Sequence, residues 1–203
     1  MRLPSLRSAA LSVLCAVPLL VQAEWFEVSL EEYAPGERLS DRGASGGAWQ
    51  DGAPSATNVF DGVRNGMEIA GGGEVVFAPN APPAGLGMER FDFSLRPEAL
   101  APFSSYEFDG AAGLVPALVD DDAPGYYGFT ARGWVALTAE GAAPAAGEWM
   151  YGRIELKRMA DDVRLVSYLV KRGAEWVRLA DAAGCEWFRA KGASAPVGTV
   201  SFT

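Results

Sequence analysis

The stretch RFDFSLR, residues 90–96, alternates strictly between polar and apolar side chains. In an extended chain, Phe91, Phe93 and Leu95 would point to one face and the polar residues to the other. A period of two residues is typical of a β-strand that buries one face and exposes the other. We therefore expect a half-buried strand here and an antiparallel β fold around it.

Short strand-like segments lie on both sides of this stretch. They are rich in aromatic and β-branched residues, and glycine and proline separate them at short intervals, as in antiparallel β proteins. The dipeptides Asp61-Gly62 and Asn65-Gly66 are turn signals that bracket a small hairpin region within residues 58–69. The other expected strands are residues 74–78, 114–119, 126–138 and a long strand that begins near Trp149, with residues 120–125 as a connection.

Residues 162–172 can form either a helix or a strand. On a helix, Val163, Val166 and Val170 would share one face, and Gly173 would suit the C-terminal cap. As a strand, the same valines and Tyr168 favour the pleated sheet. We expect the strand, continuing through a turn into a further strand at 175–179, and the helix is the alternative.

The last residues, 197–203, also read as a strand because Val200 and Phe202 alternate with polar residues. An unpaired strand at the end of a chain would be prone to aggregation. We expect it to pair with residues 25–29, and the alternative is that a final strand is missing from this sequence.

Residues 1–23 have the pattern of a secretory signal peptide. Arg2 and Arg7 supply the positive charge, and the apolar run 9–20 is too short to cross a bilayer. Val21-Gln22-Ala23 fits a cleavage site, so we expect a mature chain that begins at Glu24 and is secreted or extracytoplasmic, in the periplasm or at the cell surface. A membrane anchor is the alternative, but no later stretch has transmembrane length.

The charge of the chain argues against nucleic acid as a partner. Removing residues 1–23 would change the formal net charge from −9 to −11, because two arginines leave, and would leave 180 residues. An acidic chain without a basic run repels phosphate backbones. The length suits one β-sandwich domain over residues 24–203.

The residue types that the sequence lacks limit the kinds of catalysis and metal binding that are possible. The chain contains no histidine, and Cys185 is the single cysteine after residue 23. This excludes imidazole-based catalysis, histidine or thiolate metal sites, and an intramolecular disulfide in the mature chain. Carboxylate chemistry remains, as glycoside hydrolysis or as the binding of hard cations.

The C-terminal half resembles the concanavalin A-like, laminin G-like jelly roll of bacterial secreted proteins. The matching parts are a Gly-x-Trp strand opening, a polar turn, a strand rich in valine and tyrosine, a glycine-containing turn and a short strand, at residues 147–151, 160–162, 163–170, 171–174 and 176–179. The start of the mature chain is similar too, with Phe26-Glu27-Val28, then Tyr33-Ala34-Pro35-Gly36 and Trp49. The resemblance implies an all-β, antiparallel two-sheet sandwich, and a lectin, an adhesion module or a glycoside hydrolase as its function.

Three aromatic residues are candidates for ligand binding. Tyr126, Tyr127 and Trp134 could form a platform on which the apolar faces of sugar rings stack. The alternative for each of them is packing in the core of the sandwich.

Asp120, Asp121 and Asp122 form the densest acidic cluster, on the expected loop between two strands. The resemblance implies calcium on such a loop, and hard cations bind to several oxygens. A solvated turn is the alternative, because the spacing matches no dedicated calcium loop.

The hydrolases of this shape carry a Glu-x-Asp-x-x-Glu strand, and this sequence has no such spacing. We therefore expect a secreted, non-catalytic module that binds carbohydrate or a cell-surface ligand, or that serves in adhesion. The alternatives are a carboxylate-dependent glycoside hydrolase and a purely structural domain of a surface layer.

Overall fold

The computed structural model describes the part of the 203-residue chain that lies after the expected leader. The backbone is described at residues 34, 36–38, 41, 47–51, 56–60, 65–69, 75–79, 87–105, 107–108, 110–120, 122–159, 163–192 and 200–202, and side chains are described in these ranges except for the strands at 47–79 and 200–202. None of these residues lies in an α-helix. Accordingly, no helix in the described part of the chain could span a membrane.

A five-stranded antiparallel sheet forms one layer of the fold. Its strands are β5 (Gly87–Leu95), β9 (Met150–Arg158), β10 (Arg164–Arg172), β11 (Glu175–Arg178) and β12 (Phe188–Arg189). The order is β11-β10-β9-β5, and β12 also pairs with β10. The register places Phe91 opposite Ile154 and Leu156 opposite Val166, so apolar residues of three strands share one face.

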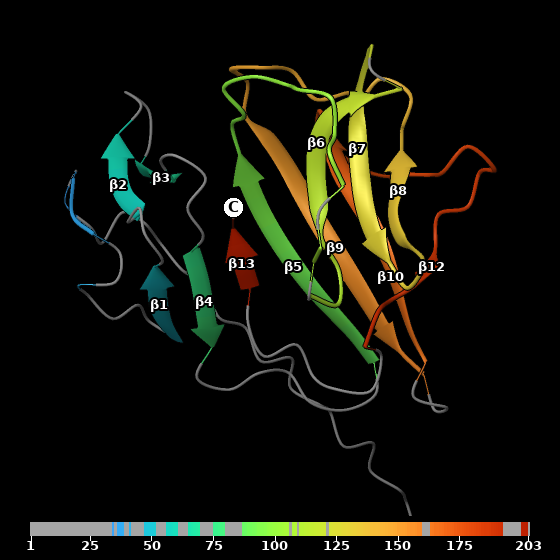
Figure 1. The fold of residues 1–203 in the computed structure, drawn as a ribbon, viewed down its shortest axis with the longest axis horizontal. Helices are drawn as coiled ribbons and strands as arrows, with labels where there is room; N and C mark the ends of the chain where they lie inside the picture. Colours follow the sequence, from blue (N-terminus) through green and yellow to red (C-terminus); the bar gives the residue numbers. More distant parts are fainter. Residues whose placement is uncertain are drawn as a thin grey trace, which may run out of the picture.

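A three-stranded antiparallel sheet forms the second layer. It consists of β6 (Leu114–Val119), β7 (Ala123–Thr130) and β8 (Gly133–Leu137), with β7 in the middle. Figure 1 shows these strands in front of β9 and β10. The described backbone elsewhere pairs β1 (Gly47–Asp51), β4 (Val75–Pro79) and β13 (Val200–Phe202) in one small sheet, and β2 (Ala56–Phe60) with β3 (Asn65–Ile69) in another.

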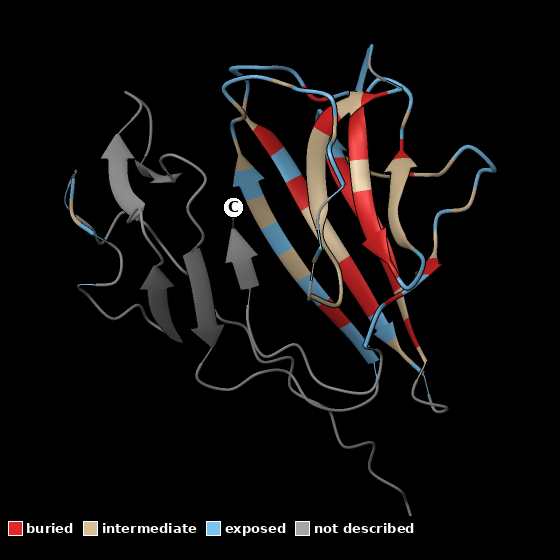
Figure 2. Cartoon of the chain, viewed as in Figure 1, coloured by how far each residue is buried: buried red, intermediate tan, exposed pale blue. Residues whose placement is uncertain are grey.

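The core lies between the five-stranded and the three-stranded sheets. Val166 and Tyr168 of β10 are 0% exposed, and Tyr126 of β7 meets them with 2% exposed. Figure 2 shows buried residues along β7, β9 and β10. Gly128 is part of this contact, because a Cβ atom there would lie 2.6 Å from the Tyr168 ring. The described chain is thus an all-β fold whose two main sheets enclose a common core.

Several expected strands are confirmed. Residues 90–95 lie in β5 with Phe91, Phe93 and Leu95 less exposed than the polar residues between them. Residues 164–172 form strand β10, so the helix alternative for 162–172 is wrong. The physical reason is that β10 lies inside the sheet, where it hydrogen-bonds to β9 on one side and to β11 and β12 on the other. This pairing and the burial of its side chains outweigh the helical periodicity of the sequence.

The structure corrects the expected connection after residue 119, the expected turn at Asn65-Gly66 and the expected partner of the terminal strand. The connection after β6 is shorter than residues 120–125, because Ala123 already pairs with Val119. Asn65-Gly66 begins strand β3 instead of forming a turn. The terminal strand pairs with β4, whereas residues 25–29 and the expected leader lie outside the described residues.

Candidate ligand-binding groove

The segment between β5 and β6 crosses the outer face of the three-stranded sheet. The N–H of Leu118 donates to the carbonyl oxygen of Ala101 at 2.9 Å, and Pro102 forms a parallel bridge to Leu118. Further along, the N–H of Phe129 donates to the carbonyl oxygen of Gly113 at 2.9 Å. Both ends of the crossing are therefore fixed to the sheet by backbone hydrogen bonds.

This segment places two phenylalanine rings on the outer side chains of β7. Phe103 stacks on Tyr127 with ring centroids 4.2 Å apart and an angle of 18° between the planes. Phe108 meets Phe129 edge to face at 4.8 Å. Such offset and edge-to-face pairs are favourable arrangements of aromatic rings. The loop and the strand thus build one aromatic layer outside the sheet.

Trp134 of β8 completes the layer. Its ring centroid lies 5.2 Å from that of Phe103, 5.5 Å from that of Phe108 and 5.0 Å from that of Phe129. It is partly exposed, whereas Phe129 beneath it is 6% exposed. Trp134 is therefore held by three rings and still presents surface to solvent.

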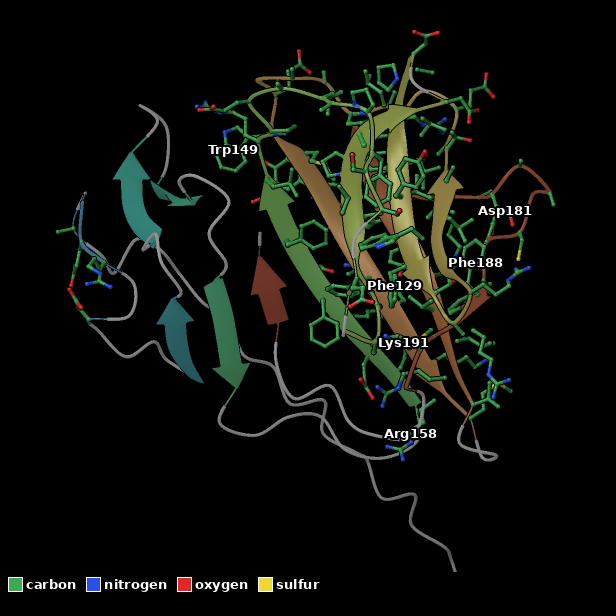
Figure 3. The ribbon with its side chains drawn as sticks, viewed as in Figure 1. Phe129, Trp149, Arg158, Asp181, Phe188 and Lys191 are labelled. Atoms are coloured by element: carbon green, nitrogen blue, oxygen red, sulfur yellow. The ribbon has the colours of Figure 1, made fainter. Side chains whose placement is uncertain are left out.

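A groove of about 760 Å³ opens beside these rings. Its lining combines apolar rings with a few polar groups: Ser105, Glu107, Phe108, Phe129, Gly133, Trp134 and Lys191. The Lys191 ammonium donates to the carbonyl oxygen of Phe108 at 2.9 Å and lies 5.4 Å from the Phe129 ring centroid. Figure 3 labels Lys191 and Phe129. Apolar walls with a few fixed polar groups are the usual make-up of a small-molecule site.

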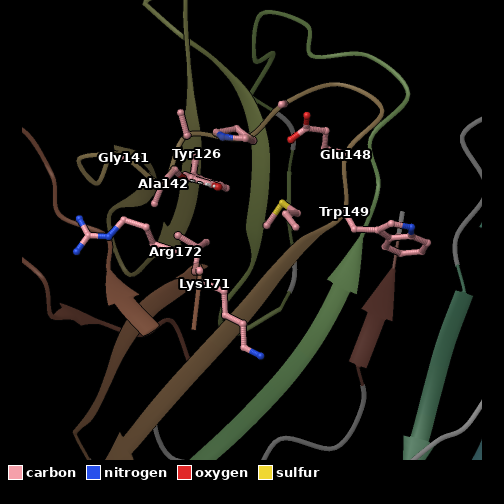
Figure 4. Close-up of a pocket in the computed structure, with 13 residues that line it drawn as sticks. Tyr126, Gly141, Ala142, Glu148, Trp149, Lys171 and Arg172 are labelled. Atoms are coloured by element: carbon pink, nitrogen blue, oxygen red, sulfur yellow. Dashed lines mark hydrogen bonds between the residues drawn. The ribbon is translucent and has the colours of Figure 1, made fainter. Parts of the chain in front are cut away.

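A smaller cavity of about 210 Å³ lies at the other end of the sandwich, with Tyr126 and Ala142 in its wall (Figure 4). The Tyr126 hydroxyl donates to the Ala142 carbonyl oxygen at 2.8 Å, and burial raises its pKa to about 12. The Arg172 guanidinium donates to the Glu140 carbonyl oxygen at 3.2 Å. These polar groups are occupied by the fold itself, so the aromatic groove is the better candidate site.

The structure places the three aromatic residues predicted to bind a ligand on two different faces of the three-stranded sheet. Trp134 lines the groove, and Tyr127 lies in the same aromatic layer beneath Phe103. Tyr126 points the other way, into the core, because neighbouring residues of a strand face opposite sides. The three therefore do not form one platform.

Sequence reasoning missed Phe108 and Phe129. The alternation within β7 carries a signal for Phe129, since it lies on the same face as Tyr127. Phe108 belongs to a loop without any period, and only the course of that loop over β7 brings it to the groove.

Two of the expected calcium residues, Asp120 and Asp122, lie in a short exposed turn between β6 and β7. Asp120 has a φ of +53° and Asp122 is exposed, whereas Asp121 lies outside the described residues. Within the described part of the chain, no group of three or more Asp, Glu or Cys side chains is placed to hold a metal ion. Calcium at this turn stays a prediction.

Two carboxylates bear on the expectation about catalysis. Glu107 is the single carboxylate among the described residues that line the groove. Glu89 is 8% exposed and lies on the core side of β5, where its Oε1 atom is 3.4 Å from Nη2 of Arg164. Burial raises the pKa of Glu89, and the charges of Arg164 and Arg158 counteract this rise. Glu89 is thus paired inside the fold and does not line the groove with Glu107.

Comparison with known proteins adds no assignment. No protein-family model, no curated protein and no solved structure matches this chain. The resemblance to the concanavalin A-like jelly roll stays a prediction, and the geometry of the groove is what supports a function.

Proposed function

We propose that this protein is a non-catalytic carbohydrate-binding module that acts outside the cytoplasm. The observation that carries the proposal is the groove beside Trp134, where partly exposed aromatic rings lie next to hydroxyl, carboxylate and ammonium groups. The proposed localisation rests on the leader-like residues 1–23.

The groove suits a sugar because a sugar ring has two kinds of surface. Its C–H faces are apolar and pack against aromatic rings, here those of Trp134 and Phe108. Its hydroxyl groups need donors and acceptors at the edges, and Ser105, Glu107 and Lys191 supply them. A volume of about 760 Å³ leaves room for more than one sugar ring.

The non-catalytic reading is supported by the carboxylates of the groove. Glycoside hydrolysis in most families uses two carboxyl groups on either side of the scissile bond. Glu107 has no second carboxylate beside it among the described lining residues. Binding without hydrolysis, in adhesion or in attachment to a surface glycan, is the function we propose.

A glycan array followed by titration calorimetry tests the proposal. We expect a neutral oligosaccharide to bind, and Trp134→Ala to weaken that binding about tenfold by removing the stacking surface. Trp149→Ala is the matched control, because Trp149 lies at the smaller cavity and not at the groove. If no glycan binds, or if folded Trp134→Ala binds as tightly as the original chain, the groove is not a carbohydrate site.

A further inference from the structure

The outer face of the five-stranded sheet is basic, although the chain as a whole is acidic. The register places side chains of β5, β9, β10, β11 and β12 in rows on this face, such as Asp92 beside Arg153 and Lys157 beside Leu165. Its basic residues are Arg90, Arg153, Lys157, Lys171, Arg178 and Arg189. Its acidic residues are Asp92 and Glu155, whereas the whole chain has 17 basic and 26 acidic residues.

Both acidic residues of this face are already neutralised by arginine. Glu155 lies 3.0 Å from Nε of Arg90 and 2.9 Å from Nη2 of Arg178, and its side chain is 4% exposed. Asp92 accepts two hydrogen bonds of 2.6 Å from Arg153. Arg153 thus binds Asp92 in a forked geometry, whereas Arg90 and Arg178 each donate one hydrogen bond to a different oxygen of Glu155. These pairs also leave little negative charge to repel an anionic ligand.

Lys157 and Arg189 provide exposed charge beyond these pairs. They lie on either side of Leu165, on β9 and β12, at one end of the face. Among the described residues, neither has a carboxylate within 4.0 Å. At the other end, the Lys171 ammonium lies 5.1 Å from the Tyr151 ring centroid. Cations thus extend along the face in both directions from the paired arginines.

The aromatic rings of this face hold cations in place. Arg153 lies 4.3 Å from the Trp176 ring centroid, and Arg178 lies 5.0 Å from that of Trp187. Cation–π contacts of this kind fix the orientation of the guanidinium groups. Since each of these rings already carries one of the protein's own cations, less ring surface is left for stacking nucleobases.

We infer that this face binds an acidic polysaccharide that carries uronate carboxylates. The charges are complementary. A sheet of strands about 4.8 Å apart presents fixed cations in rows, and a polyuronate presents carboxylates at regular intervals that can pair with them. Nucleic acid fits less well because its charge is dense, at about one per 1.7 Å of duplex, and the rest of this acidic chain repels it. The surface lies on the opposite side of the core from the Trp134 groove and is independent of it.

Affinity electrophoresis of the full chain tests this inference. The gels contain polygalacturonate, or the same polymer with its carboxyl groups methyl-esterified, at several salt concentrations. We expect retardation by the charged polymer alone, and a loss of affinity as salt rises, because salt screens exposed charges. Equal retardation by both polymers, or none by either, would overturn the inference. Binding to single-stranded oligothymidine or to anionic phosphatidylserine vesicles in preference to polygalacturonate would also overturn it.

Variants of equal charge locate the surface. Lys157→Gln with Arg189→Gln should weaken polygalacturonate binding about tenfold, since two exposed cations leave the face. Arg132→Gln with Arg172→Gln removes the same charge away from this face, at the turn between β7 and β8 and at the end of β10, and should change binding less than twofold. Equal losses in the two double variants would mean that overall charge, and not this face, governs binding. Trp134→Ala should leave polygalacturonate binding intact, so failure of the groove and failure of this surface can be told apart.

Discussion

The hydroxyl of Tyr168 donates a hydrogen bond to the carbonyl oxygen of Phe129 and so joins the core to the floor of the groove. The same hydroxyl accepts a hydrogen bond from the N–H of Gly113 at 3.3 Å. Tyr168 is 0% exposed and belongs to β10, whereas Phe129 belongs to β7 in the other sheet. One buried hydroxyl therefore connects the two sheets at Phe129, a residue that lines the groove.

Tyr168→Phe should lower both the stability and the glycan affinity of the protein. The substitution leaves the Phe129 carbonyl oxygen and the Gly113 N–H without this partner, which costs about 1–3 kcal/mol of unfolding free energy. Urea unfolding measures the first effect and calorimetry with the array-selected glycan the second. Tyr126→Phe is the control, because it removes another buried hydroxyl hydrogen bond, to Ala142, away from the groove. We expect it to lower stability alone, and equal glycan affinities in the two variants would contradict the link between Tyr168 and the groove.

Gly128→Ala should destabilise the fold by overpacking the core. A Cβ atom at this position would lie 2.5 Å from Cδ1 of Leu137 and 2.6 Å from the Tyr168 ring, closer than atoms can approach. Adding a methyl group to a well-packed core typically costs about 1–3 kcal/mol. Thermal unfolding checks this value. Adding Leu137→Ala should not rescue this variant, because the clash with the Tyr168 ring remains and the lost leucine side chain leaves a cavity. An unchanged melting temperature in the single variant would show that this part of the core is loosely packed.

Glu155 should make the stability of the fold depend on pH. Burial by itself raises the pKa of Glu155, but hydrogen bonds and charges from Arg178 and Arg90 outweigh burial and hold the pKa below its ordinary value of 4.5. A carboxylate with a depressed pKa stabilises the folded state above the unfolded pKa, and this stabilisation is lost as pH falls through the folded pKa.

The Glu155→Gln variant tests that sign. At pH 7 it should lower the unfolding free energy by about 2 kcal/mol, because two charge-assisted hydrogen bonds are weakened. The difference from the original chain should shrink as pH falls below 4.5, where the original side chain becomes protonated in the unfolded state. Urea titrations at pH 3 to 8 measure it. A difference that stays constant over this range would show that the ion pairs with Arg90 and Arg178 add nothing.

Removal of divalent cations should leave glycan binding in the groove unchanged. The described lining contains one carboxylate, Glu107, and a calcium ion needs about six or more oxygen ligands. We expect the same dissociation constant with EDTA as with added calcium. A calcium-dependent affinity would instead bring the turn at Asp120 and Asp122 into the binding mechanism, and Asp120→Asn would then have to abolish that dependence.

The sequence by itself determined the strands and the face to which each strand residue points. Alternation in residues 90–96 placed Phe91, Phe93 and Leu95 on the core side of β5, because a period of two follows from the pleat alone. The same rule puts Tyr126 and Tyr127 on opposite faces, so it conflicts with the platform of Tyr126, Tyr127 and Trp134 that we expected from residue type, and the structure places Tyr126 in the core.

Only the tertiary structure decided which faces meet and what they carry. Phe108 reaches the groove because its loop crosses β7, and a loop has no period from which its course can be read. Arg90 and Glu155 are 65 residues apart in sequence, and they meet because β5 pairs with β9 in one particular register. The basic face follows from that register as well: a shift of one residue would turn the side chains of a strand to the other face, so the charges of separate strands form a surface only once the strands have paired.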